Sequence, residues 1–282
     1  MLNKIIKTVV ICTLMVTLGG CELALFDPKG PVGEQAKLLI IISVALMLIV
    51  IIPVIFMTFY FPYKYRTSNK KAVYKPHWEH STKIELIVWL VPCLIVIALA
   101  IVTYQTSHSL DPRKPLGKDE DTVTIQVVAL DWKWLFIYPE QQIATINEIA
   151  IPVNKPIEFL ITSDTVMNSF FIPRLGSQIY AMAGMENRLN LMASEQGVFR
   201  GMSANYSGFG FSGMKFKTHA LDQVGFEQWI SKVKRSPLKL DEKMYQMLSK
   251  KTKDHAIQHF HDVDPLHFKK TIEKYTGVQS GK

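Results

Sequence analysis

Two long apolar stretches constrain the fold of this 282-residue chain more than any other feature. Residues 38–63 contain no formal charge and are rich in Ile, Leu and Val, and residues 84–106 carry only Glu85. About 20 consecutive apolar residues are enough to cross the hydrocarbon core of a bilayer. Their internal prolines, Pro53 and Pro92, are tolerated in membrane helices, where they introduce kinks. The sequence therefore predicts a hairpin of two transmembrane helices.

The loop between these stretches, residues 64–83, is strongly basic and predicts their orientation. Its basic residues are Lys64, Arg66, Lys70, Lys71, Lys75 and Lys83. Only Glu79 opposes them within the loop. A basic loop of this kind faces the cytoplasm, so both ends of the hairpin are expected outside. The formal net charge of +8 therefore indicates membrane topology rather than a surface that binds nucleic acid.

The first 20 residues have the order of an export signal. A basic start precedes an apolar run that is too short to span a bilayer. The run ends in Leu18-Gly19-Gly20-Cys21, which is similar to the cleavage box of bacterial lipoproteins. We expect cleavage before Cys21 and lipidation of its thiol, with residues 21–37 as an external segment. A plain signal peptide and an uncleaved anchor are the alternatives.

Beyond a linker at residues 107–121, the sequence predicts a domain built of short strands. Residues 122–130 alternate in polarity, and residues 132–138 carry aromatic side chains at period two. Further strands are expected at residues 148–152, 157–162, 169–172, 188–193 and 214–218. Such spacing without intervening helices predicts an all-β Greek-key sandwich or barrel over residues 122–220. The charged C-terminal extension, residues 221–282, contains helical patches at 222–233, 241–250 and 265–275.

Residues 201–214 form a loop with the spacing of a metal site but without its ligands. Ser203 and Ser207 are four residues apart, and Phe211 and Met214 follow. Cys, Cys, His and Met in the same frame would hold a two-copper electron-transfer centre, because copper requires soft, ionised thiolates. Serine hydroxyls are hard donors that stay protonated near neutral pH. We therefore expect a loop that has kept its shape and lost its metal chemistry.

Two other groups of residues leave alternatives open. His255, His259 and His261, with His267 beyond, would provide an i, i+4 metal pair if their segment is helical, although solvated surface histidines are the more common outcome. Two tryptophans, Trp132 and Trp134, share a face if their segment is a strand. Three roles are then open for them: a patch where electrons enter, a contact with a partner subunit, or packing in the core. The sequence contains no catalytic-triad order, phosphate loop or dinucleotide fingerprint, so it does not support a stand-alone enzyme.

Several long runs of residues resemble one protein family. They include Asp131-Trp-Lys-Trp134, Ile137-Tyr-Pro-Glu-Gln141, residues 166–184, Tyr206-Ser-Gly208 and residues 210–216. Together with the hairpin and the lipoprotein box, they are similar to subunit II of the haem–copper respiratory oxidases, above all to the bo-type ubiquinol oxidases of bacteria. The resemblance covers residues 21–275. It implies a two-helix membrane hairpin followed by an external, cupredoxin-like Greek-key sandwich.

In the cytochrome c branch of this family, a dinuclear copper centre bound by two His, two Cys, one Met and a Glu carbonyl accepts the electron. By position these ligands fall on Asn168, Ser203, Asn205, Ser207, Phe211 and Met214. Only the Met is kept, so the resemblance implies the quinol branch, with no cofactor in this chain and no cytochrome c as partner. Residues 111–282 hold 22 Lys and Arg against 19 Asp and Glu, which offers no acidic docking surface for a basic cytochrome. Haems, copper and the ubiquinol site are implied for subunit I.

Glu85 has two interpretations. From its position alone, a carboxylate in the first turn of a helix favours the helix dipole. In the family, a subunit II glutamate at this position lies at the mouth of a proton channel through subunit I, so the resemblance implies a functional role.

We therefore expect a non-redox subunit of a proton-pumping quinol oxidase in the bacterial inner membrane. Its C-terminal domain would lie in the periplasm, with subunit I, other oxidase subunits and membrane lipid as partners. Two alternatives remain. One is a cytochrome c oxidase subunit with copper bound by unexpected residues, and the other is a free-standing membrane lipoprotein that binds a ligand or senses copper.

Overall fold

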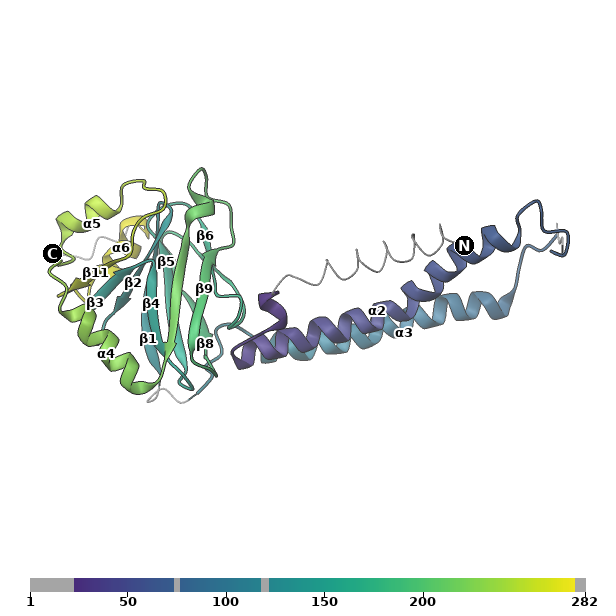
Figure 1. Ribbon diagram of the computed structural model, residues 1–282, viewed down its shortest axis with the longest axis horizontal. Helices are drawn as coiled ribbons and strands as arrows, with labels where there is room; N and C mark the ends of the chain where they lie inside the picture. The colour runs from purple at the N-terminus through teal and green to yellow at the C-terminus, as the bar shows by residue number, and fades with distance from the viewer. Residues whose placement is uncertain (1–22, 74–76, 118–121, 277–282) are drawn as a thin grey trace, which may run out of the picture. The chain divides into compact units, whose positions relative to one another are not determined.

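The structure is a computed structural model that describes residues 23–73, 77–117 and 122–276 (Figure 1). The chain divides into two compact units. One contains residues 35–114, and the other contains residues 115–282 together with the N-terminal segment up to Glu34. The predicted combination of two apolar helices, a β-sandwich and C-terminal helices is confirmed.

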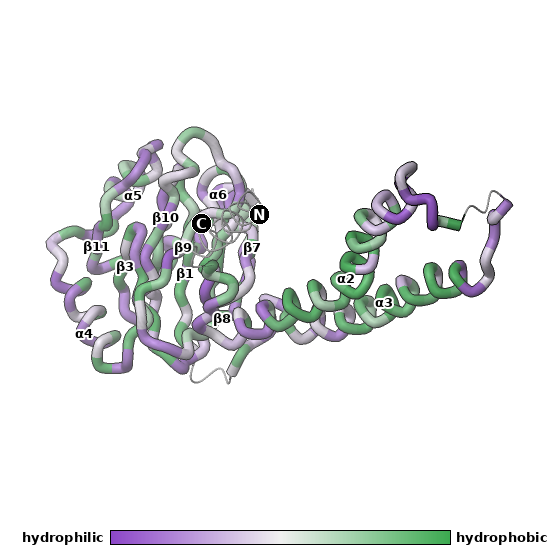
Figure 2. The backbone as a smooth tube through the Cα atoms, turned by 45° about the vertical axis from the view of Figure 1, so that its right-hand side comes forward, coloured by the Kyte–Doolittle hydropathy of each residue, from purple (hydrophilic) through white to green (hydrophobic). Residues whose placement is uncertain are grey.

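The first unit is a hairpin of two long helices, α2 (Pro31–Lys64) and α3 (Thr82–Ser109). They run side by side in both overall views (Figures 1 and 2) and are long and apolar enough to cross a membrane. Pro53 interrupts the hydrogen-bond ladder of α2 and accounts for the bend that Figure 1 shows in its second half. Both helices extend beyond the stretches expected from hydropathy, because a helix continues into polar residues as long as its backbone hydrogen bonds are satisfied.

The second unit is a sandwich of two sheets (Figure 1). Sheet A has the strand order β11-β3-β2-β1-β5-β8, and sheet B has the order β4-β10-β9-β6-β7. Sheet A consists of β1 (Val123–Leu130), β2 (Lys133–Tyr138), β3 (Ile143–Ile146), β5 (Ile157–Ser163), β8 (Asn187–Leu191) and β11 (Gln258–His261). Sheet B consists of β4 (Glu148–Pro152), β6 (Asn168–Phe171), β7 (Ile179–Ala181), β9 (Gly197–Ser203) and β10 (Lys215–Leu221). Two neighbouring pairs, β1 with β5 and β4 with β10, are parallel, which requires crossover connections.

Aromatic side chains fill the space between the sheets. Trp134 and Phe136 from sheet A pack against Phe170 and Phe216 from sheet B, with ring centroids 5.0–6.2 Å apart. The Tyr138 hydroxyl also joins the sheets, because it donates to the Ala150 carbonyl at 2.8 Å and accepts from the Ala150 N–H at 2.9 Å. The strands that carry the candidate loop are therefore held by a rigid core.

A second core lies on the outer face of sheet A, where the C-terminal extension covers it. The extension contains α4 (Gln223–Lys234), α5 (Glu242–Leu248), β11 and α6 (His267–Thr276). Sheet A contributes Val128, Leu130, Leu135, Ile137, Ala144 and Ile146 to this core, and the extension contributes Leu240, Tyr245, Leu248, Phe260, Val263 and Phe268. All six residues of β2 are buried as a result, since both faces of this strand are covered.

The strand predictions were incomplete. They missed β3, β7, β9 and β11. Three of these have only three or four residues, and β9 begins at Gly197 and contains Gly201, which weakens the strand pattern. The extension was expected to be helical, but β11 joins sheet A beside β3.

Candidate functional site

Three of the positions expected for former copper ligands form one hydrogen-bonded network between β6 and β9. The Ser203 hydroxyl, at the end of β9, lies 3.2 Å from both the Asn168 Oδ1 and the Asn205 carbonyl oxygen. Asn168 donates from Nδ2 to the Val166 carbonyl at 3.0 Å, and Asn205 donates to the Met167 carbonyl at 3.1 Å. These polar groups therefore already satisfy one another.

The other three positions make different contacts. The Ser207 carbonyl accepts a hydrogen bond from Trp132 Nε1 at 2.9 Å, whereas its buried hydroxyl has no hydrogen-bond partner among the described residues. Phe211 lies in a short 3-10 helix, η3 (Phe211–Gly213), with its ring 5.7 Å from that of Tyr206. Met214 is buried in the sandwich core, 1% exposed.

The residues at these six positions do not fit a copper pair. They offer two hydroxyls, two amides and a buried thioether, all of them neutral, where bridging thiolates and imidazoles are needed. Among the described residues, no cluster of three or more His, Cys, Asp or Glu side chains has the arrangement of a metal site.

Two tryptophans support the loop in different ways. Trp132 lies between β1 and β2 with a left-handed backbone (φ 64°), and its indole contacts Gly208 and Gly210 of the loop. A Cβ at Gly210 would lie 2.3 Å from the indole, so only glycine allows the loop this close approach. Trp134 is fully buried in the core. Trp132 packs against the same core cluster, although it precedes β2, which begins at Lys133, so the two tryptophans are not part of one continuous strand.

Glu85 lies in the first turn of α3, where its N–H donates to the carbonyl of the N-cap residue Ser81 at 3.0 Å. Its Oε1 is 2.5 Å from His80 Nδ1, and His80 Nε2 lies 3.2 Å from the Thr82 hydroxyl. The side chains of His80 and Glu85 are 65% and 49% exposed in the isolated chain. The structure thus gives Glu85 an imidazole neighbour, His80, that the sequence pattern did not indicate.

Three polar anchors, also missed from sequence, attach the C-terminal extension to the sandwich. The first is Lys133, which is fully buried. Its Nζ donates to the carbonyls of Leu248 at 2.7 Å, Lys250 at 2.8 Å and Asp131 at 3.3 Å. Burial lowers the pKa of Lys133 to about 8, although Asp131 opposes this effect. A cation at this position suits the C-terminal end of α5, where the helix dipole is negative.

The second anchor is Asp164, whose side chain is 1% exposed. Its carboxylate accepts from Lys274 Nζ at 2.7 Å and from the Tyr245 hydroxyl at 2.9 Å. The Tyr275 hydroxyl donates to the Asp164 backbone carbonyl at 2.8 Å. This one residue after β5 therefore holds both α5 and α6.

The third anchor is Glu148 at the start of β4. His219 Nε2 from β10 and His259 Nε2 from β11 lie 3.0 Å and 2.7 Å from its two oxygens. The pKa of Glu148 is lowered to about 2, although the carboxylate is partly buried. The main cause is the hydrogen bond with His219, and the hydrogen bond with His259 contributes less. His259 and His261 lie in a strand rather than a helix, so the considered helical metal pair is wrong.

The proposed lipidation site, Cys21, lies outside the described residues.

Comparison with known proteins places these features in a family. Residues 120–221 match the family described as "Cytochrome C oxidase subunit II, periplasmic domain", and residues 234–278 match the "COX Aromatic Rich Motif". The chain is 54% identical over 268 residues to "Cytochrome bo(3) ubiquinol oxidase subunit 2" of Pseudomonas putida, which covers 95% of this chain and 85% of that protein. It is 56% identical over 260 residues to "Ubiquinol oxidase subunit 2" of Acetobacter aceti, covering 92% and 84%.

Among solved structures, the chain is similar to the periplasmic domain of subunit II of cytochrome oxidase from Bradyrhizobium japonicum. The TM-score is 0.38 at 24% sequence identity, with 39% of this chain and 91% of that domain covered.

Proposed function

The chain belongs to the cytochrome c oxidase subunit II family, among the members named ubiquinol oxidase subunit 2, and we propose that it is a subunit without a redox centre. In this proposal, the complex oxidises ubiquinol and reduces oxygen to water, and the haems and copper belong to subunit I. The observation that carries the proposal is the set of side chains at the former copper positions between β6 and β9. There the Ser203 hydroxyl lies within hydrogen-bond distance of Asn168 and Asn205 instead of a thiolate binding a metal ion.

Exposed apolar side chains beside the same loop support a role in contacting subunit I. Phe209 is 79% exposed, Tyr206 75% and Val166 54%. Phe209 and Tyr206 belong to the loop itself, and a contiguous apolar patch on a folded domain marks an interaction site. A rigid sandwich that presents them would stabilise the external face of subunit I without carrying electrons.

Glu85 supports a second role, at the proton entrance of subunit I. It stands at the start of α3, directly after the basic loop that is expected to face the cytoplasm. The contact with His80 places an imidazole nitrogen 2.5 Å from the carboxylate, so a second proton donor or acceptor group stands at this entrance. Glu85 would then pass protons inward from the cytoplasmic side.

The same proposal locates the chain in the bacterial inner membrane, with the sandwich in the periplasm. The hairpin of α2 and α3 and the periplasmic domain family support this location. A lipid chain on Cys21 would add about 0.8 kcal/mol of membrane affinity for each buried methylene group. Mass spectrometry of the mature N-terminus tests this last point.

Purification of the intact complex tests the absence of a redox centre. We expect oxygen consumption with ubiquinol and none with reduced cytochrome c, and no copper bound to this chain after its separation from subunit I. Stoichiometric copper on the separated chain, with the near-infrared absorption of a mixed-valence pair, would contradict the proposal.

The substitution Glu85→Ala tests the proton role. We expect the complex to assemble, with oxygen reduction slowed roughly tenfold, which corresponds to about 1.4 kcal/mol on the activation barrier. Glu79→Ala, which removes the other carboxylate of this region, is the matched control and should leave turnover unchanged. Normal turnover of an assembled Glu85→Ala complex would remove the assignment.

A further inference from the structure

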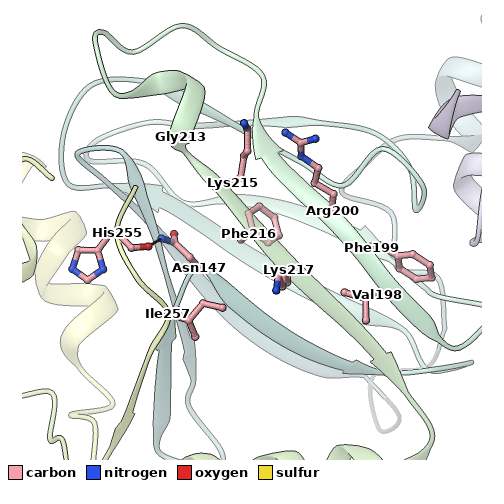
Figure 3. A pocket seen from close by; sticks show the side chains of 10 residues that line it. All are labelled: Asn147, Val198, Phe199, Arg200, Gly213, Lys215, Phe216, Lys217, His255 and Ile257. Carbon is pink, nitrogen blue, oxygen red and sulfur yellow. Dashed lines mark hydrogen bonds between the residues drawn. The ribbon is translucent and has the colours of Figure 1, made fainter. Parts of the chain in front are cut away.

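Three cations lie close together on the outward face of sheet B. Arg200 on β9 is directly opposite Lys217 on β10, and Lys215 lies two residues away on the same face. All three side chains are exposed. Figure 3 shows them along the two strands. Like charges directly opposite each other destabilise an antiparallel pair, so an anionic partner would stabilise this arrangement.

The described part of the chain does not supply that partner. None of the three cations forms an ion pair with a described residue. Glu148 is opposite Lys217 in the register of β4 with β10, but His219 and His259 bind its two oxygens. The charge of Glu148 therefore offsets at most one of the three cations, and the group of side chains stays net positive.

The cations border a hollow of about 420 Å³. Apolar residues from both sides line it, including Val198 and Ile257, which are 61% and 41% exposed. Asn147 and His255 complete the wall next to the C-terminal extension, and the Asn147 Nδ2 donates to the His255 carbonyl at 2.8 Å (Figure 3). The hollow thus offers apolar contact beside a row of positive charges.

We propose that this basic groove is the docking surface for an acidic polypeptide segment of a neighbouring oxidase subunit. Lys215 and Lys217 are alternate residues of a strand, so their side chains repeat at about 6.8 Å. That is also the repeat of alternate side chains in an extended segment, which can place carboxylates opposite both lysines and Arg200. An apolar side chain of the same segment would fill the hollow beside Val198. The inference rests on membership of a multi-subunit oxidase, and it is independent of the roles proposed for Glu85 and the former copper loop.

Zero-length cross-linking of the purified intact complex tests the contact directly. A carbodiimide joins lysine amines to carboxylates only where they already touch. We expect Lys215 or Lys217 to be joined to an Asp or Glu of another subunit. The proposal fails if cross-links form elsewhere between subunits but neither lysine reacts with another chain. Acetylation of the two lysines provides a further check. The proposal also fails if the complex protects them only when it is placed in vesicles of anionic lipid, because the groove then binds a lipid headgroup rather than a polypeptide.

A charge-removal variant provides the second test. In Arg200→Gln/Lys215→Gln/Lys217→Gln, the neighbouring subunit should dissociate from the complex at lower salt concentration than in the wild type. The control is Lys232→Gln/Lys234→Gln/Arg235→Gln at the end of α4, which removes the same charges from another exposed site. Equal salt tolerance of the groove variant and the wild type would overturn the proposal. The turnover of the Glu85→Ala complex tests only the proposed proton role, so normal turnover of that variant would leave the docking proposal unaffected.

Discussion

At the scale of single residues, the contact between His80 and Glu85 makes the proposed role of Glu85 in proton uptake testable. Since His80 Nδ1 lies 2.5 Å from the carboxylate, an imidazolium at this position could transfer its proton to Glu85, become neutral imidazole and take up another proton from water. We expect His80→Ala to lower oxygen-reduction turnover in the intact complex, by less than Glu85→Ala does, because the carboxylate itself is kept. His77→Ala, in the same loop, should not change turnover. Equal rates for His80→Ala and the wild type would exclude the step.

Glu148 makes the stability of the sandwich depend on pH. Its pKa falls from an ordinary value of 4.5 to about 2 in the folded chain, mainly through the hydrogen bond from His219. A carboxylate with a depressed pKa stabilises the fold above pH 4.5, and this contribution is lost as the pH falls towards 2. The loss should reach up to about 3 kcal/mol, at 1.36 kcal/mol per pKa unit.

Denaturant unfolding of the purified chain between pH 2 and pH 6 measures this contribution. Other carboxylates titrate in the same range, so the informative quantity is the difference between the wild type and Glu148→Gln. We expect this difference to be largest above pH 4.5 and to shrink as the solution is acidified. A difference independent of pH would show that the His219 and His259 contacts do not stabilise the charged carboxylate.

At the scale of secondary-structure elements, the helices follow from local sequence and the short strands do not. Asp222 and Asp241 cap α4 and α5 by accepting hydrogen bonds from the N–H groups of Gly225 and Met244, both at 2.8 Å. Such caps can be recognised in the sequence. By contrast, β11 has four residues, and its partner β3 lies more than 100 residues earlier, so no local pattern identifies the pair.

The end of α5 gives a prediction at this scale. Lys133 donates to the carbonyls of Leu248 and Lys250, which the end of the helix leaves without intrahelical partners. In Lys133→Met these carbonyls lose their donor while the apolar stem is largely kept. We expect the free energy of unfolding to fall by about 1–3 kcal/mol. Lys243→Met, an exposed change within α5, should alter it by less than about 0.5 kcal/mol. Equal stability of the two variants would contradict the anchor.

At the scale of the whole molecule, the sequence identifies the architecture but not the attachment of the extension. The charge-free stretch before residue 64 and the basic loop predict the hairpin because hydropathy and charge act locally. The anchors could not be predicted, since Lys133 meets Leu248 and Asp164 meets Lys274 across more than 100 residues. One hint was available in β2, which is apolar on both faces apart from Lys133, a pattern typical of a strand covered on both sides. Its buried lysine then needs acceptors from elsewhere in the chain.

The covered outer face of sheet A predicts that the extension is part of the folded domain rather than a tail. A chain ending at residue 236 would expose the outer side chains of β1, β2 and β3 and lose Phe260, which is fully buried. Each fully buried large apolar side chain contributes about 1.5–3 kcal/mol, and whole domains are stable by only about 5–15 kcal/mol. We therefore expect this truncation to prevent accumulation of the subunit and assembly of the oxidase, as measured by immunoblotting and haem spectra of membranes. A chain ending at residue 276 keeps α6 and all three anchors, so it should assemble at the wild-type level. Wild-type assembly of the shorter chain would show that sheet A is stable without its cover.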